Sequence, residues 1–158
     1  MSTFSKIILI LILVFIDQIS KYWILSFLEL GESFNLLPFL DLTLIFNSGI
    51  AFGLLDNLGN LGSWLLYLLV TGIIIYFTYL TLKAESKTES LIMLLILSGG
   101  LGNVIDRTIY GYVVDFIHFN FNGYSFYVFN FADSLITVGA ILYIWFFFIR
   151  NKDETITS

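Results

Sequence analysis

Three aspartates stand where a largely apolar chain is least expected to carry charge. Asp106 closes one long apolar run, Asp133 opens another, and Asp115 lies in the segment between them. An unpaired charge in lipid costs about 2.5–3.5 kcal/mol, so an ionisable residue there is by default a candidate functional residue. The chain has no cysteine and one histidine. Two neighbouring carboxyl groups therefore point to acid–base chemistry by a pair of aspartates.

The composition predicts an integral membrane protein. Hydrophobic residues make up 58% of the 158 residues and charged residues 12%, whereas a soluble domain has about 25% charged residues. The length suits a single domain over residues 1–158. The formal net charge of −5 argues against a nucleic-acid partner, because nucleic-acid binding needs a basic surface.

Four apolar segments are expected to form transmembrane helices, because a span needs about 20 apolar residues. They cover residues 7–28, 61–82, 91–105 and 132–149. Most basic residues fall at the two chain ends or between the second and third segments, namely Lys6, Lys83, Lys87, Arg150 and Lys152. Positive charge marks the cytoplasmic side of a membrane protein. Both termini are therefore expected in the cytoplasm, and the predicted aspartate pair at the outer half of the bilayer.

The two longer connections are expected on the outer side and to contain strands. Residues 40–46 show a rough two-residue alternation, and residues 113–130 combine β-branched and aromatic residues with Asn122-Gly123, a strong hairpin signal. Residues 54–61 are compatible with a short interfacial helix. The expected fold is an all-α membrane protein with a small β part: four transmembrane helices with a β-rich cap.

Several polar groups also have a structural explanation. Asp17 and Lys21 are four residues apart on one predicted helix, in the order that favours an ion pair; support of an active site is equally open. Asp106 is better explained by pairing with Arg107 or Lys21 than by a chemical role. Gly99 and Gly102 would let another helix approach closely, as small residues do in membranes.

The other two aspartates differ in how easily they are explained. Asn130 and Asp133 have the spacing of a capping box at the start of the fourth helix. Asp115 lies in an apolar segment with no adjacent basic residue. Burial raises the pKa of a carboxyl group, and a second carboxylate raises one of a pair further. This reasoning favours a catalytic pair over purely structural carboxylates.

Other chemistries find less support. A serine catalyst would need His118 to meet Ser98, Ser134 or another serine, and His118 is better explained as an interfacial hairpin residue. A divalent cation held by Asp106, Asp115 and Asp133 is conceivable, but no ligand motif accompanies them. We therefore expect no metal and no cofactor. The alternative from another class of function is a small membrane transport or assembly subunit that uses the acidic cluster as a binding site.

Five blocks of the chain together resemble the lipoprotein signal peptidase (signal peptidase II) family of bacteria. They occur in the order of that family and over nearly the whole chain. The blocks are Asp17-Gln18-x-x-Lys21, Asn47-Ser48-Gly49-Ile50-Ala51-Phe52-Gly53, Gly99-Gly100-x-Gly102-Asn103-x-x-Asp106-Arg107, Val113-Val114-Asp115-Phe116 and Phe129-Asn130-x-Ala132-Asp133-Ser134.

The resemblance implies an intramembrane aspartyl endopeptidase of the bacterial cytoplasmic (inner) membrane, with its active site toward the outer leaflet. It would remove signal peptides from diacylglyceryl-modified prolipoproteins by cleaving before the lipidated cysteine. Asp115 and Asp133 match the catalytic pair. The supporting or substrate-contacting positions are Asp17, Lys21, Asn47, Gly49, Asn103, Arg107 and Asn130. The implied partners are the lipid-modified prolipoprotein, membrane lipid and cyclic peptide antibiotics such as globomycin.

The predicted orientation can be tested by cysteine labelling in intact cells. Cysteines placed at Ser63 and Ser125 are expected to react with an impermeant thiol reagent from outside. A cysteine at Ser86 should react only after the membrane is permeabilised. The chain contains no cysteine of its own, so each signal is unambiguous. Outside labelling at Ser86 would invert the orientation.

Overall fold

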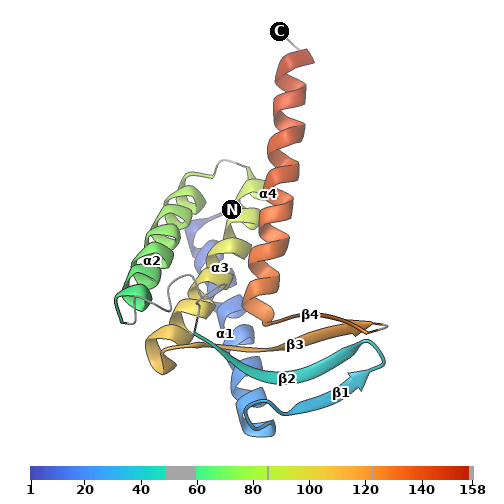
Figure 1. Cartoon of the computed structure of the whole chain (residues 1–158). Helices are drawn as coiled ribbons and strands as arrows, with labels where there is room; N and C mark the ends of the chain where they lie inside the picture. Colours follow the sequence, from blue (N-terminus) through green and yellow to red (C-terminus); the bar gives the residue numbers. More distant parts are fainter. Residues whose placement is uncertain (49–59, 85, 122, 157–158) are drawn as a thin grey trace.

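The computed structural model describes residues 1–48, 60–84, 86–121 and 123–156. In chain order the described elements are α1 (Thr3–Phe27), β1 (Ser33–Leu37), β2 (Leu40–Asn47), α2 (Asn60–Lys83), α3 (Lys87–Tyr110), β3 (Val113–Phe121), β4 (Tyr124–Phe129) and α4 (Phe131–Ile156). The helices form a bundle, and the sheet projects sideways from one end of it (Figure 1). The start of α1 and the end of α4 both lie on the side away from the sheet.

Each of the four predicted apolar segments corresponds to a described helix. The prediction that all four cross the membrane is confirmed only in part. Three of them, α1, α3 and α4, are long and apolar enough to cross a membrane, whereas the apolar stretch described in α2 is shorter, Tyr67–Lys83. Helix α3 extends beyond the predicted third segment, which reached about residue 105: it continues to Tyr110 and stops at Gly111, whose φ of 82° is left-handed. Glycine, which lacks a Cβ, adopts that conformation without strain.

Helix α3 is the centre of the bundle and packs against α1, α2 and α4. In its most apolar 18-residue window 56% of residues are buried, against 17% in α1 and in α4. Glycines permit the close packing. A Cβ on Gly99 would collide with the carbonyl oxygen of Ala132 in α4, and one on Gly102 with the carboxylate of Asp17 in α1. The predicted close approach at these two glycines is confirmed.

The sheet is antiparallel throughout, in the order β1-β2-β3-β4. It contains the predicted strand over residues 40–46 and the predicted hairpin, in which Gly123 has a φ of 83°. Asn122 lies outside the described residues, as do residues 54–59 of the expected interfacial helix. Strand β1 was not predicted. All five of its residues are exposed, so the alternation that reveals a half-buried strand is missing.

An apolar cluster holds the sheet on the end of α1. Its buried members are Ile24, Leu28, Leu42, Leu44, Val114 and Phe116. Strand β3 begins shortly after α3 ends, and α4 begins shortly after β4 ends. The cluster therefore fixes the start of β3, which carries Asp115, against α1, and Asn130 just before α4 hydrogen-bonds to Asp115.

The close contact between α3 and α4 can be tested at Gly99. Gly99→Ala should lower the free energy of unfolding by about 1–3 kcal/mol, because the added methyl overpacks the contact with Ala132. Gly72→Ala in α2 is the matched control, since a Cβ there meets nothing within 4 Å. Thermal unfolding in detergent should show a lower midpoint only for Gly99→Ala. Equal midpoints would contradict the packing described.

Candidate active site

Asp133 occupies the first turn of α4 in a reciprocal capping arrangement. The Asp133 N–H donates to Asn130 Oδ1 at 2.9 Å, and the Asn130 N–H donates to Asp133 Oδ2 at 3.3 Å. The predicted capping box is thus confirmed. Both bonds satisfy N–H groups that a helix start leaves without partners inside the helix. They also fix the direction of the Asp133 carboxylate.

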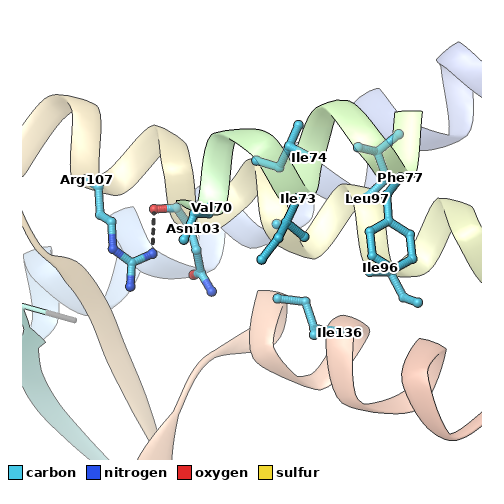
Figure 2. Close-up of a pocket in the computed structure, with 10 residues that line it drawn as sticks. Val70, Ile73, Ile74, Phe77, Ile96, Leu97, Asn103, Arg107 and Ile136 are labelled. Atoms are coloured by element: carbon cyan, nitrogen blue, oxygen red, sulfur yellow. Dashed lines mark hydrogen bonds between the residues drawn. The ribbon is translucent and has the colours of Figure 1, made fainter. Parts of the chain in front are cut away.

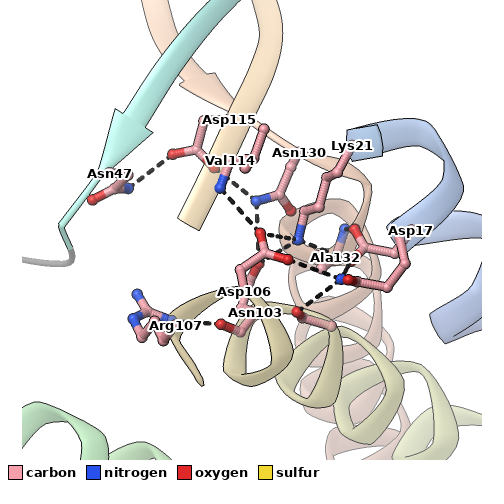
Figure 3. A network of polar contacts seen from close by, with 12 residues as sticks. Asp17, Lys21, Asn47, Asn103, Asp106, Arg107, Val114, Asp115, Asn130 and Ala132 are labelled. Carbon is pink, nitrogen blue, oxygen red and sulfur yellow. Dashed lines mark hydrogen bonds and ion pairs between the residues drawn. The ribbon is translucent and has the colours of Figure 1, made fainter. Parts of the chain in front are cut away.

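Asp115 lies on β3, is 2% exposed, and accepts hydrogen bonds from two amide side chains. Asn47 Nδ2 donates to Asp115 Oδ2 at 2.8 Å from the end of β2, and Asn130 Nδ2 donates to Oδ1 at 2.7 Å (Figure 3). The same Asn130 side chain therefore contacts Asp115 with its nitrogen and the Asp133 N–H with its oxygen. Asn130 joins the two predicted catalytic positions.

Asn103 on α3 makes a second link. Its Nδ2 donates to Asp133 Oδ1 at 2.7 Å, and its Oδ1 accepts from Asn130 Nδ2 at 3.1 Å and from Lys21 Nζ at 3.1 Å. A carboxylate with such partners is held in one orientation. Asparagine suits these positions because it offers a donor and an acceptor at once.

Burial and charge act together on Asp115. Loss of water raises the pKa of Asp115 to about 6, and the negative charge of Asp133 adds to the rise. The hydrogen bonds from Asn47 and Asn130 and the charge of Lys21 oppose it. Asp115 therefore holds its proton to a higher pH than an ordinary aspartate, as one member of a carboxyl pair can.

A buried ion cluster lies beside the pair. Lys21 Nζ is 2.8 Å from Asp17 Oδ2 and 2.9 Å from Asp106 Oδ2, and all three side chains are at most 2% exposed. Gln18 Nε2 also donates to Asp17 at 3.1 Å and to Asp106 at 2.9 Å. The predicted pairing of Lys21 with Asp17 is confirmed. Asp106 has the structural role that the sequence favoured, with Lys21 as its partner.

Both acids of the ion cluster also accept backbone hydrogen bonds. Asp17 Oδ1 accepts from the Ala132 N–H at 2.9 Å, and Asp106 Oδ2 accepts from the Val114 N–H at 3.0 Å. The first bond ties α1 to the start of α4, and the second ties α3 to the start of β3 (Figure 3).

Arg107 lies at one end of a cavity of about 280 Å³ between α2, α3 and α4 (Figure 2). Its Nη1 donates weakly to the Asn103 carbonyl oxygen at 3.5 Å. Its buried Nε has no hydrogen-bond partner among the described residues. Apart from Asn103 and Arg107 the lining is apolar, and it includes Ile74, Phe77 and Ile136.

A second hollow lies over the sheet. This groove of about 360 Å³ is lined by Asp115, Asn47, Tyr127 and neighbouring residues of β2 and β4. Asp115 thus opens into the groove while Asn103 opens into the cavity. The two spaces have no lining residue in common.

The structure brings together most of the predicted site residues. Asp17, Lys21, Asn47, Asn103, Asp115, Asn130 and Asp133 are connected by the contacts described above, and Arg107 adjoins them through Asn103. Gly49 lies outside the described residues. The sequence reasoning missed the bridging role of Gln18, although its place beside Asp17 on a membrane-length helix marked it as an unusual polar group.

His118 belongs to a different network. Its Nε2 is 2.8 Å from Ser125 Oγ, and its Nδ1 is 3.8 Å from Asp41 Oδ2. Asp41 also accepts hydrogen bonds from Asn35 and Asn120. These contacts cross all four strands and fasten the outer part of the sheet. Among the described residues no group of three or more His, Asp or Glu side chains is arranged to hold a metal ion.

The sequence of the chain is similar to a known family of proteins. Residues 9–149 match the peptidase A8 family, described as signal peptidase (SPase) II. A lipoprotein signal peptidase of Shewanella baltica (strain OS195) is 41% identical over 146 residues, which cover 89% of this chain and 84% of the relative. One of Burkholderia thailandensis is 43% identical over 136 residues, covering 85% and 82%.

Two solved structures have a fold similar to that of this chain. A bacterial membrane enzyme determined by the in meso method at 1.9 Å superposes with a TM-score of 0.78 at 36% identity, covering 90% of this chain and 91% of the other. A second, at 2.3 Å, gives 0.82 at 33% identity, covering 96% and 92%.

The raised pKa of Asp115 predicts a pH dependence of stability. A carboxyl group whose folded-state pKa of about 6 exceeds its unfolded value stabilises the fold most at low pH, and this contribution is lost as pH rises through 6. The loss attributable to Asp115 between pH 4 and pH 7.5 should be about 2 kcal/mol. Thermal unfolding of wild type and Asp115→Asn in detergent should therefore diverge over this range, with wild type losing more. Parallel curves would show that Asp115 titrates normally.

Proposed function

The chain belongs to the lipoprotein signal peptidase (signal peptidase II) family of aspartic peptidases, and we propose that Asp115 and Asp133 are the two carboxyl groups that perform its cleavage. The substrate that this family membership implies is a prolipoprotein. We propose that residues 1–158 form one peptidase domain. The observation that carries the assignment is the joining of both aspartates by Asn130 and Asn103, beside a groove that opens onto Asp115.

The two aspartates take different roles in this proposal. Asp133 is the base: it accepts hydrogen bonds from Asn103 and from a backbone N–H, and it lies in the first turn of α4, where the helix dipole favours negative charge. Asp115 holds the proton, because its burial and the neighbouring charge raise its pKa to about 6.

The reaction then follows in two steps, each with two proton transfers. Asp133 takes a proton from a water molecule as the water oxygen attacks the scissile carbonyl carbon, and Asp115 donates its proton to the developing oxyanion. As the C–N bond breaks, the proton held by Asp133 passes to the leaving amine, and Asp115 recovers its own. General acid–base assistance of this kind contributes about 10²–10⁴-fold to the rate.

The two hollows suit the two sides of a bound peptide. The apolar cavity between α2, α3 and α4 would take an apolar side chain on one side of the scissile bond, with the unpaired Nε of Arg107 donating to a peptide carbonyl oxygen. The groove over β2 and β4 would take the chain on the other side, next to Asp115. Holding the peptide in this way supplies the orientation that lowers the barrier.

The same arrangement supports a proposed placement in the membrane. We propose that four helices cross the bacterial inner membrane with both termini in the cytoplasm, and that the sheet lies at the outer leaflet. Both ends of the described chain lie away from the sheet (Figure 1). The sheet exposes aromatic side chains suited to a lipid–water interface, namely Phe119, Phe121, Tyr124 and Phe126. The diacylglyceryl group of the substrate would remain in that leaflet, and cleavage would fall before the lipidated cysteine.

Cyclic peptide antibiotics such as globomycin should occupy the same path. A cyclic peptide presents carbonyl oxygens and apolar side chains like those of the substrate, so we propose that it fills the space between Arg107 and Asp115. Globomycin titrated into the cleavage assay should then raise the apparent KM for a lipidated peptide. Inhibition that leaves KM unchanged would place it elsewhere.

The central test replaces each aspartate by its amide. Asp115→Asn and Asp133→Asn should each lower kcat for a lipidated precursor peptide by about 10²–10⁴-fold or more, since an amide serves neither as base nor as proton donor. The measurement is steady-state cleavage by purified protein, with thermal unfolding to establish that each variant is folded.

Asp41→Asn is the matched control, because Asp41 is another largely buried aspartate of the sheet, at 14% exposure, in a network apart from the pair. It should retain activity within a few fold of wild type. Near-normal turnover in folded Asp115→Asn or Asp133→Asn would refute the assignment of the pair.

A further inference from the structure

The ion cluster accepts a hydrogen bond from the backbone next to each aspartate of the pair. Asp17 Oδ1 accepts the N–H of Ala132, the residue immediately before Asp133. Asp106 Oδ2 accepts the N–H of Val114, the residue immediately before Asp115. Each catalytic position is therefore preceded by a backbone group held by a different buried carboxylate.

Two side chains of α1 join these carboxylates to each other. Lys21 Nζ lies 2.8 Å from Asp17 and 2.9 Å from Asp106, and Gln18 Nε2 lies 3.1 Å and 2.9 Å from the same two groups. The connection thus runs from Ala132 through Asp17 to α1, and from α1 through Asp106 to Val114 (Figure 3).

We propose that Asp17 and Asp106, bridged by Lys21 and Gln18, are positioning residues that set the distance between Asp115 and Asp133. The proposal rests on the proposed function, in which those two aspartates perform the cleavage. Under this proposal, Gln18 and Asp106 affect turnover. The ion cluster then does more than neutralise buried charges: it also positions the pair.

The cluster has little freedom to move. Both oxygens of Asp17 and both oxygens of Asp106 are engaged, and both side chains are fully buried. Gln18 also donates to the Gly102 carbonyl oxygen at 3.1 Å. A Cβ on Gly102 would collide with the Asp17 carboxylate, so α3 leaves room for this carboxylate only because residue 102 is glycine. Any change in the spacing would break several of these bonds at once.

The spacing matters for chemistry because two carboxyl groups influence each other through distance. Coulomb repulsion falls as the separation grows, and a misplacement of about 1 Å can cost about 10²-fold in rate. Among the described residues, the charged groups that act on Asp115 are Asp133 on α4, Lys21 on α1 and Arg107 on α3. Replacing Lys21 would alter this field directly, so a neutral change is the sharper test.

Gln18→Met is that neutral change. It keeps the length and helix propensity of the side chain but removes its bonds to Asp17, Asp106 and the Gly102 carbonyl oxygen. We expect kcat to fall about tenfold with KM within twofold of wild type. The alkaline limb of kcat/KM against pH, which reports the proton on Asp115, should move to lower pH as repulsion from Asp133 weakens. Asp17→Asn, which weakens the hydrogen bond from the Ala132 N–H, should also lower kcat.

Lys6→Met is the matched control on the same helix. Lys6 is 6% exposed, and its Nζ donates to the Thr81 carbonyl oxygen at 2.6 Å, so its loss also removes a buried bond between helices. It should lower the thermal midpoint while leaving kcat per folded molecule and the pH profile unchanged.

The outcomes separate the two proposals. If Gln18→Met and Asp17→Asn lose activity only in proportion to their folded fraction, with the wild-type pH profile, the positioning role is overturned and the pair stands. If Asp115→Asn or Asp133→Asn cleaves the peptide at near-normal rate, the proposed function fails whatever Gln18→Met does.

Discussion

A lysine ammonium in the interior of a membrane-length helix is the group on which the rest of the structure depends. A charge in hydrocarbon must find a partner, and Lys21 finds Asp17 on its own helix and Asp106 on α3. Breaking such a buried pair by removing one partner costs about 3–5 kcal/mol. The need to satisfy one buried ammonium therefore brings α1 and α3 together, and through their carboxylates it fastens the starts of α4 and β3.

The same cluster explains why the aspartate pair lies between a helix and a sheet. Asp133 is oriented by the cap of α4, and Asp115 by a strand whose apolar neighbours, Val114 and Phe116, are buried against the end of α1. Helix starts and strands are rigid, so side chains on them are held more accurately than side chains on loops. Asn130 and Asn103 then join both carboxylates, while burial and the charge of Asp133 raise the pKa of Asp115 to about 6.

Much of this arrangement could be predicted from the sequence, and the features that could not be predicted have physical reasons. The i,i+4 spacing of Asp17 and Lys21, the capping pattern of Asn130 and Asp133, and the hairpin around Gly123 are local signals, and all three appear in the structure. Strand β1 is exposed throughout and carries no periodic signal. The contacts of Gln18 with Asp106, and of Asn47 with Asp115, join residues 88 and 68 positions apart, and no spacing rule reaches that far.

Asp115 carries the proton in this mechanism because burial, and then the nearby charge of Asp133, raise its pKa. Infrared difference spectroscopy of the protein in lipid, titrated through the acidic and neutral range, measures that proton directly, with the band assigned by its loss in Asp115→Asn. We expect the Asp115 carboxyl band to titrate with a midpoint near 6 in the wild-type protein, and at lower pH in Asp133→Asn. A wild-type midpoint near about 3.9, the ordinary value for aspartate, unaffected by Asp133→Asn, would contradict this mechanism.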